Sequence, residues 1–477
     1  MNQVQFNIQD RFRIFSILFI ASAVAAVYLR LDYFYFIPFA ALTAYAGWEQ
    51  PRLALYMLLL SLPVSIELGI TNELSLDFPD EPLMILCASL CMFALLHNPA
   101  LFTRGMGTHP LLVVLILSLT WIIVPILASE HKVYSIKFIA AKLWYLAAFV
   151  FAPHFFLTDK RSILRAIKLI SYSLLAIVVI SLVRHAASGF TFQQVNSSVV
   201  PFFRNHVNYS AMLVCFIPVF ITFYLHAKNK SLRIILMSCV FLLLAALFFS
   251  YARGAWLALF TGICAWWLIK RKLLLKAYIA SVIIAFGLFF WIQQEKKYLQ
   301  YAHDFNSTIY HENFSEHLRA TYQLKDVSTA ERFYRWIAGV RMIDEKPLTG
   351  FGPGTFYHHY KGYAVPAFKT WVSRNEERST VHNYYLLITI EQGVPGLLIF
   401  LVLCGMLLYY SQNLYHKMTD RFYRAVSINC GIIIVMIMTV NFMSDLIETD
   451  KVGSIFFLCL SFLTMIDLRR RNIGGRL

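Results

Sequence analysis

Two arginines in the second half of the chain could bind a phosphate ester. Arg332 and Arg335 lie three residues apart in a segment with apolar residues at helical spacing, so their side chains share one helix face. Two adjacent guanidinium groups suit a pyrophosphate, because each can donate two parallel hydrogen bonds to phosphate oxygens. Alternatively, Arg335 pairs with Glu331, four residues earlier, and both arginines face water. Spacing alone favours this second interpretation.

His382 lies where a long polar segment meets an apolar run. A neutral imidazole there could accept a proton from a hydroxyl group, because its unperturbed pKa lies near working pH. Histidines at such a boundary more often cap a helix or contact lipid headgroups, and residue type alone favours that role. In the same apolar run, Glu391 precedes Gly393 and Pro395. A carboxylate and a helix break inside a span usually face protein or a water-filled cavity.

Arg253 and Arg204 each lie in a polar turn beside an apolar run. Arg253 is in the turn 250–256 between two runs, and Arg204 precedes the run that starts at residue 209. An arginine at a membrane boundary is costly unless paired, and the phosphate of a lipid-linked substrate is a suitable partner. It could equally reach lipid headgroups. The glycine-rich stretch 350–354 lacks the Lys-Ser/Thr of a phosphate-binding loop, so it predicts a tight turn.

The elements that must position these residues are membrane-spanning helices. Of the 477 residues, 59% are hydrophobic and only 14% are charged, whereas soluble domains are about one quarter charged. This composition excludes an ordinary soluble enzyme and a disordered chain. It predicts an all-α polytopic membrane protein with about 12–14 transmembrane helices. The predicted spans are 14–29, 33–48, 53–69, 83–98, 110–128, 139–157, 164–184, 209–226, 233–251, 254–269, 277–293, 384–410, 425–443 and 453–468.

Basic residues set the expected orientation. Lys and Arg gather in alternate short loops, which places both termini in the cytoplasm. Topology and one large loop account for the net charge of +16, and no nucleic-acid-binding motif is present. The eight cysteines all lie inside apolar runs, so they indicate neither disulfides nor a metal site.

Residues 294–383 are expected to form a large loop on the opposite, outer side. The expected organisation is an N-terminal bundle of about eleven spans over 1–293, this loop, and about three C-terminal spans with a cytoplasmic tail over 384–477. Inside the loop, the apolar periodicity predicts an amphipathic helix over about 329–345. The basic residues of the loop either are solvated or bind an anion. Its first histidines and glutamates match no usual metal-site spacing: His303, His311, Glu312, Glu316 and His317.

Three stretches together resemble the O-antigen ligase family, which also includes O-antigen polymerases and bacterial protein O-oligosaccharyltransferases. The first is the Ser-x-x-Arg-Gly-Ala-Trp-Leu-Ala turn at 250–258, where the family usually has Ser-Arg-Gly. The second, 331–356, joins Glu-Arg and Trp to Lys-Pro-Leu-Thr-Gly-Phe-Gly-Pro-Gly-Thr-Phe. The third, 382–396, begins His-Asn-Tyr-Tyr-Leu and contains Glu-Gln-Gly. The resemblance covers roughly residues 195–410, and the first 190 residues match only in being hydrophobic.

The resemblance implies a glycosyltransferase in the bacterial inner membrane, GT-C-like in architecture, with its active site facing the periplasm. Such enzymes move a glycan from an undecaprenyl diphosphate carrier to an acceptor hydroxyl, without a cofactor or an obligatory metal. The favoured acceptor is the lipid A–core of lipopolysaccharide, which makes O-antigen ligation the expected reaction. Besides this donor and acceptor, only membrane lipids are expected as partners, and no nucleic acid.

The resemblance also implies roles for individual residues. Arg253 and Arg332 match the functional arginines of the family, and His382 matches its functional histidine. His382 would act as a general base on the acceptor hydroxyl or, as a protonated side chain, would donate to phosphate. In-line attack by the acceptor would invert the anomeric carbon. The positions assigned to diphosphate or glycan binding are Arg335, Arg204, Asn383 and Glu391.

The sequence is also compatible with other functions. A polymerase would use the same donor chemistry with another carrier-linked repeat unit as acceptor. A protein acceptor is disfavoured, because no further region resembles a polypeptide-binding site. A flippase of the lipid-linked glycan would also need outer arginines, but transporters usually contain repeats with paired broken helices. This sequence contains one clear break, at 391–396, which favours an enzyme.

Overall fold

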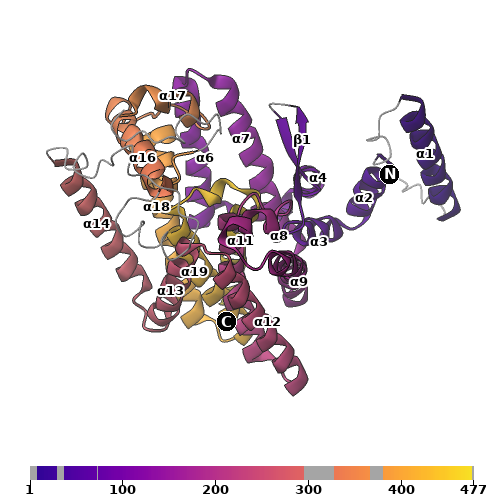
Figure 1. The fold of residues 1–477 in the computed structure, drawn as a ribbon. Helices are drawn as coiled ribbons and strands as arrows, with labels where there is room; N and C mark the ends of the chain where they lie inside the picture. The colour runs from indigo at the N-terminus through magenta and orange to yellow at the C-terminus, as the bar shows by residue number, and fades with distance from the viewer. Residues whose placement is uncertain (1–7, 30–36, 72–73, 295–326, 366–379, 475–477) are drawn as a thin grey trace.

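The computed structural model describes residues 8–29, 37–71, 74–294, 327–365 and 380–474 (Figure 1). It confirms an all-α polytopic membrane protein, with one two-stranded hairpin beside the helices. Among the described residues, ten helices are long and apolar enough to cross a membrane. The elements that precede the large loop are α1 (Ile8–Leu29), α2 (Ile37–Glu49), α3 (Pro51–Ser61), β1 (Ile66–Thr71), β2 (Leu74–Phe78), α4 (Asp80–His97), α5 (Arg104–Gly107), α6 (Pro110–Ala128), α7 (Lys132–Leu146), α8 (Ala152–Phe156), α9 (Lys160–Ala187), α10 (Val195–Val199), α11 (His206–His226), α12 (Lys230–Phe249), α13 (Arg253–Lys270) and α14 (Leu274–Gln293).

Ten such helices are fewer than the predicted 12–14, and the N-terminal part explains most of the difference. The predicted span 53–69 is wrong: α3 ends at Ser61, and the chain enters β1 at Ile66. Pro63 follows α3 closely, and proline cannot continue a helix without losing a hydrogen bond. The predicted span 33–48 corresponds to α2, which has 13 residues, and a span needs about 20.

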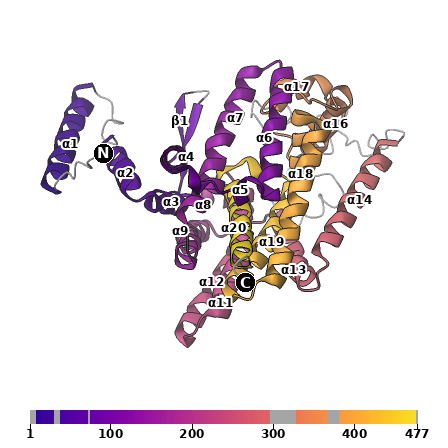
Figure 2. The same cartoon turned by 180° about the vertical axis from the view of Figure 1, so that it is seen from behind.

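The C-terminal helices form the centre of the bundle. α18 (Tyr384–Lys417), α19 (Arg421–Asn441) and α20 (Asp450–Gly474) pack against one another, and α19 also packs against α11 and α13. The segments α19 and α20 are the most buried of the candidate spans, whereas α14 lies at the periphery (Figures 1 and 2). Segments far apart in the sequence therefore meet around the last three helices.

Two helices of the large loop lie at one end of the bundle, beside α6 and α7, and the C-terminus lies at the other end (Figures 1 and 2). α16 (Val327–Glu345) confirms the predicted amphipathic helix over 329–345. It is followed by α17 (Phe356–Tyr363). The histidines and glutamates between 303 and 317 lie outside the described residues. We call the end that carries α16 and α17 the loop end of the bundle.

α18 is broken near its start, as the sequence predicts. Gly393 has φ 72° and ψ 177°, which no helix adopts. The rings of Tyr384 and Phe400 lie 4.9 Å apart, although sixteen residues of straight helix span about 24 Å. The second part of α18 therefore turns back alongside the first, and the break exposes backbone carbonyls that need donors.

The glycine-rich stretch 350–354 supplies those donors. Phe351 N donates to Ile390 O at 2.9 Å, and Gly352 N donates to Glu391 O at 3.0 Å. A Cβ atom at Gly350 would lie 2.5 Å from the Glu391 carbonyl carbon, so only glycine permits this approach. The stretch is thus a tight turn that closes on the break in α18, as predicted.

Replacing Gly393 with alanine should destabilise the fold. Its φ of +72° is unfavourable for a side chain, and the added Cβ would lie 2.1 Å from Leu348 O. The backbone conformation alone costs about 1–3 kcal/mol for a residue with a side chain, so we expect a lower midpoint of thermal unfolding in detergent. As the control, Gly287→Ala adds a Cβ with nothing within 4 Å and should leave the midpoint unchanged or raise it. Equal midpoints for the two variants would contradict this account.

Candidate functional site

α16 is fixed against the segment that leads into α18. Trp336 Nε1 donates to Val381 O at 3.0 Å, and Arg335 Nη1 donates to Thr380 O at 3.4 Å. Farther along α16, a Cβ at Gly339 would contact Ile390 Cδ1 at 2.7 Å, so the helix lies closely on the first part of α18. These contacts bring the arginine-bearing helix to the residues that flank His382.

Arg335 pairs with Glu331, as the second interpretation of their spacing in the sequence predicts. Arg335 Nη2 lies 3.4 Å from Glu331 Oε2. The side chains are only 11% and 8% exposed, so the pair does not face water. A buried ion pair offsets its desolvation only with good geometry and further hydrogen bonds. Here the pair holds a guanidinium group in place inside the site.

His382 is held in an unusual backbone conformation beside a carboxylate. Its φ is 53°, which is uncommon for a residue other than glycine. Its Nδ1 lies 3.9 Å from Asp445 Oδ1, and its side chain is 37% exposed. Burial raises the pKa of Asp445, and a hydrogen bond from the Thr380 hydroxyl partly opposes this rise. The exposed part of the imidazole leaves room for a substrate group to approach.

The electrostatic surroundings of His382 are positive. Partial burial holds the pKa of this imidazole far below its ordinary value. The guanidinium groups of Arg335, Arg332 and Arg204 act in the same direction, because a further positive charge is unfavourable beside them. His382 is therefore neutral at pH 7 and able to accept a proton. Three predicted arginines thus act on the predicted histidine in the folded chain.

Arg253 borders this cluster from another helix. It is the first residue of α13, and a Cβ at neighbouring Gly254 would lie 3.9 Å from Met443 Cβ. Met443 precedes Asp445 by two residues. The N-terminus of α13, where the helix dipole is positive, therefore adjoins the segment that holds Asp445.

Asn383 connects the start of α18 to the end of α19 at the site. Its Oδ1 accepts a hydrogen bond from Leu386 N at 3.0 Å, and its Nδ2 donates to Phe442 O at 3.1 Å. The first bond caps α18, and the second ties its start to the end of α19. These contacts indicate that Asn383 positions His382; its predicted contact with a glycan stays a prediction.

Glu391 is buried at the break in α18. Its Oε1 accepts a hydrogen bond from Phe356 N at 3.2 Å, at the start of α17. An acidic side chain at a helix N-terminus satisfies a backbone donor that has no partner within the helix. The contact indicates that Glu391 anchors α17 to α18, and its predicted role in substrate binding stays a prediction.

Sequence reasoning missed Asp445, which the structure places beside His382. The available signal was weak: an acidic residue in the short segment 444–451 between two predicted spans. It also missed an ion pair next to the site, in which Lys142 Nζ lies 3.1 Å from Glu448 Oε1. These residues are separated by 306 positions, so no local sequence pattern could reveal their contact.

The assembled cluster can stabilise an anion and remove a proton from a hydroxyl group. Its guanidinium groups suit a diphosphate, and its neutral imidazole can act as a general base. Within the part of the chain that the structure describes, no three His, Cys, Asp or Glu side chains group as metal ligands would.

Comparison with known proteins agrees with this chemistry. Residues 238–401 match the model of a protein family described as O-antigen ligase, which confirms the resemblance in the sequence. The matched segment contains Arg253, Arg332, Arg335 and His382, whereas Arg204 and Asp445 lie outside it. No curated protein matches the chain. In general terms, the family indicates glycosyl transfer between a glycan donor and an acceptor at a membrane.

Proposed function

On the premise that residues 238–401 are an O-antigen ligase domain, we propose that this protein transfers a glycan from undecaprenyl diphosphate to an acceptor hydroxyl. The proposed acceptor is the lipid A–core of lipopolysaccharide. The reaction takes place at the periplasmic face of the bacterial inner membrane, with both termini in the cytoplasm. It needs no metal and inverts the anomeric centre.

One observation carries the proposal: a neutral histidine lies among arginines and beside a carboxylate at one end of a membrane bundle. His382 supplies the base, Asp445 lies 3.9 Å from its Nδ1, and Arg332, Arg335 and Arg204 surround it with positive charge. A diphosphate leaving group and a hydroxyl nucleophile need these functions. A flippase would need the arginines but no base.

The proposed mechanism is a single displacement. The acceptor oxygen attacks the anomeric carbon while His382 takes the hydroxyl proton, and the sugar–phosphate bond breaks with its electron pair leaving on the diphosphate. The arginines stabilise this departing charge more strongly than they stabilise the bound donor, which lowers the barrier. The carboxylate of Asp445 stabilises the imidazolium that forms. Attack from the face opposite the diphosphate inverts the anomeric centre.

The pH profile distinguishes a base from a cationic phosphate donor. Because the pKa of His382 is lowered, the neutral form persists well below pH 6.5. We therefore expect kcat/KM of the wild-type protein to stay flat from pH 8 to below 6.5 and to fall only as the pH drops through the lowered pKa. A protonated donor would instead give a rate that rises as the pH falls. The profile of His382→Gln corrects for any ionisation of the substrates.

The first experiment is transfer in proteoliposomes from purified undecaprenyl-diphosphate O-antigen to rough lipopolysaccharide, which carries lipid A–core without O-antigen. Ligated lipopolysaccharide, detected by gel and mass spectrometry, would support the proposal. Longer glycan on the carrier, without ligated product, would make the protein a polymerase. Movement of the carrier across the bilayer without any new bond would make it a transporter.

A further inference from the structure

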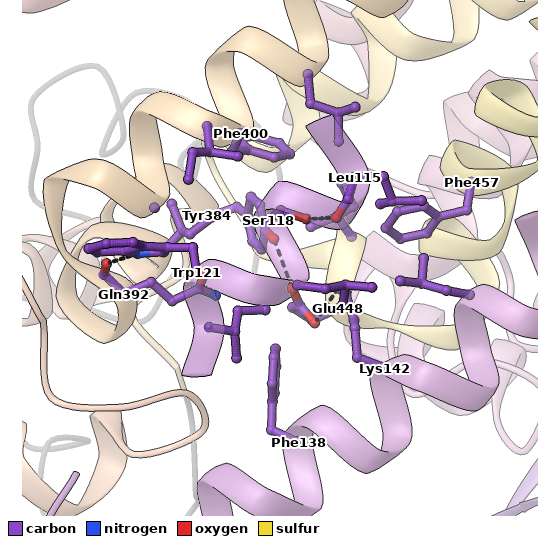
Figure 3. Close-up of a pocket in the computed structure, with 18 of the residues that line it drawn as sticks. Leu115, Ser118, Trp121, Phe138, Lys142, Tyr384, Gln392, Phe400, Glu448 and Phe457 are labelled. Atoms are coloured by element: carbon purple, nitrogen blue, oxygen red, sulfur yellow. Dashed lines mark hydrogen bonds and ion pairs between the residues drawn. The ribbon is translucent and has the colours of Figure 1, made fainter. Parts of the chain in front are cut away.

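A cavity lies between α6, α7, α18 and α20 (Figure 3). Most of its lining is apolar or aromatic and includes Leu115, Phe400 and Phe457. In Figure 3, the labelled side chains of Lys142, Glu448 and Tyr384 meet on one side of it. Its described lining includes none of the arginines of the cluster and not His382. The cavity is thus separate from the proposed catalytic group.

Three polar side chains form a connected network in the cavity. Lys142 Nζ lies 3.1 Å and 3.2 Å from the two carboxylate oxygens of Glu448. The hydroxyl of Tyr384 donates to Glu448 Oε1 at 2.8 Å. Lys142 and Glu448 are 14% and 23% exposed, so the pair is mostly buried but remains open to a ligand.

The stability of the fold does not by itself explain why an ion pair occupies this position. Well-packed hydrophobic residues often replace a buried ion pair at no cost, because the desolvation penalty offsets the Coulombic gain. The surrounding walls already provide aromatic packing, with Lys142 Nζ 5.2 Å from the ring centroid of Phe457. A charged network within otherwise apolar walls is typical of a binding site, where a few polar groups orient the ligand.

The charge of the surroundings argues against an anionic ligand. A second cavity shares Lys142 and Glu448 with the first and adds Glu81 and Asp450. The titratable side chains of the two linings thus comprise three acids, one lysine and two tyrosines. Carboxylates accept hydrogen bonds from hydroxyl groups, and aromatic faces attract the weakly positive C–H groups of a sugar ring. This lining suits a saccharide better than a diphosphate.

The same two segments contribute to the cavity and to the His382 cluster. Tyr384 follows His382 by two residues, and Glu448 follows Asp445 by three. Even a fully extended chain would separate the Cα atoms of these pairs by at most about 7 Å and 11 Å. The cavity lining is therefore joined to the proposed base and to its neighbouring carboxylate by two short segments of chain.

The geometry points to this cavity as the acceptor subsite, which takes the hydroxyl-bearing saccharide end of a membrane-anchored glycolipid. Glu448 and Tyr384 bind hydroxyl groups of one terminal sugar residue, and Lys142 holds the carboxylate of Glu448 in place. The ion pair lines both this cavity of about 40 Å³ and a second one of about 200 Å³. This inference rests on the proposed transfer, because it assigns the site of the second substrate.

The test compares Glu448→Gln and Tyr384→Phe with the wild-type protein, since both changes preserve shape and remove one polar function. Rough lipopolysaccharide is the acceptor probe, and undecaprenyl-diphosphate O-antigen is the donor. We expect KM for the acceptor to rise about tenfold, which corresponds to one hydrogen bond to a charged group. KM for the donor should stay within about twofold. Binding of rough lipopolysaccharide without donor, measured by microscale thermophoresis, should weaken by the same factor.

Lys160→Met is the control. Lys160 pairs with Asp420 between the starts of α9 and α19, far from the loop end, so acceptor KM should not change. Unchanged acceptor KM and binding in both test variants would overturn the inference, and so would an equal rise in donor KM. If the wild-type protein transfers nothing but binds rough lipopolysaccharide through Glu448, the proposed function fails and the subsite stands.

Discussion

His382→Ala is expected to reduce glycan transfer by about 10²–10⁴-fold, which is the usual contribution of a positioned general base. The loss should appear in kcat, because the imidazole acts on the acceptor hydroxyl only as the new bond forms. Binding of the undecaprenyl-diphosphate donor should be retained or slightly tighter, since the arginines remain. Single-turnover transfer in proteoliposomes measures the rate, and equilibrium binding measures the donor affinity.

A matched histidine controls for general damage to the fold. His226 lies at the end of α11, where its Nδ1 contacts Thr222 O at 2.9 Å, and His226→Ala should transfer glycan at the wild-type rate. Unfolding midpoints of both variants in detergent show whether either change destabilises the protein. A fully active His382→Ala would mean that another group removes the proton, and the mechanism proposed above would be wrong.

Arg332→Ala is expected to lower kcat by about 10²–10³-fold, the effect of removing one donor to a developing negative charge. In the proposed mechanism, the guanidinium group acts on the departing diphosphate, whose charge grows as the sugar–phosphate bond breaks. Lysine should not restore the rate, because an ammonium group cannot donate two parallel hydrogen bonds to phosphate oxygens. The same single-turnover assay applies, with donor concentration varied to separate kcat from KM.

The control for Arg332 lies on the same helix. Arg341 is exposed, and its Nη1 contacts Tyr363 O at 3.5 Å, so Arg341→Ala should keep the rate within about twofold, as expected for a surface substitution. Equal losses in the two variants would indicate that α16 fails to dock, and no loss in Arg332→Ala would remove this residue from the mechanism. Either result would contradict the assigned role.

The features that could be predicted from the sequence depend on residues that lie near one another in the chain. The amphipathic helix 329–345 was predicted because its apolar residues repeat with the helical period, and α16 confirms it. The break at 391–396 and the tight turn at 350–354 were also predicted, because glycine and proline restrict the backbone locally. Most of the spans follow in the same way from continuous apolar runs, since the membrane requires length and hydrophobicity in one segment.

The local sequence pattern gave a wrong prediction for one segment of the N-terminal part. The run 53–69 is apolar enough to suggest a span, yet the structure ends α3 at Ser61 and forms a β-hairpin that starts at Ile66. The sequence also left Glu391 and Asn383 as substrate-binding candidates. Their hydrogen bonds to Phe356 N and Phe442 O show contacts within the fold, which residue type alone cannot predict.

The sequence by itself determined that the chain is a helical membrane protein and which arginines and histidine could do chemistry. Both conclusions depend only on composition and on the spacing of residues within single segments. Only the tertiary structure decided which of them act on one another. It placed the charges of Arg335, Arg332 and Arg204 where they lower the pKa of His382. It also brought Asp445 to within 3.9 Å of the same ring and joined Lys142 to Glu448. Packing around α18–α20 sets these distances, and packing depends on contacts between segments hundreds of residues apart.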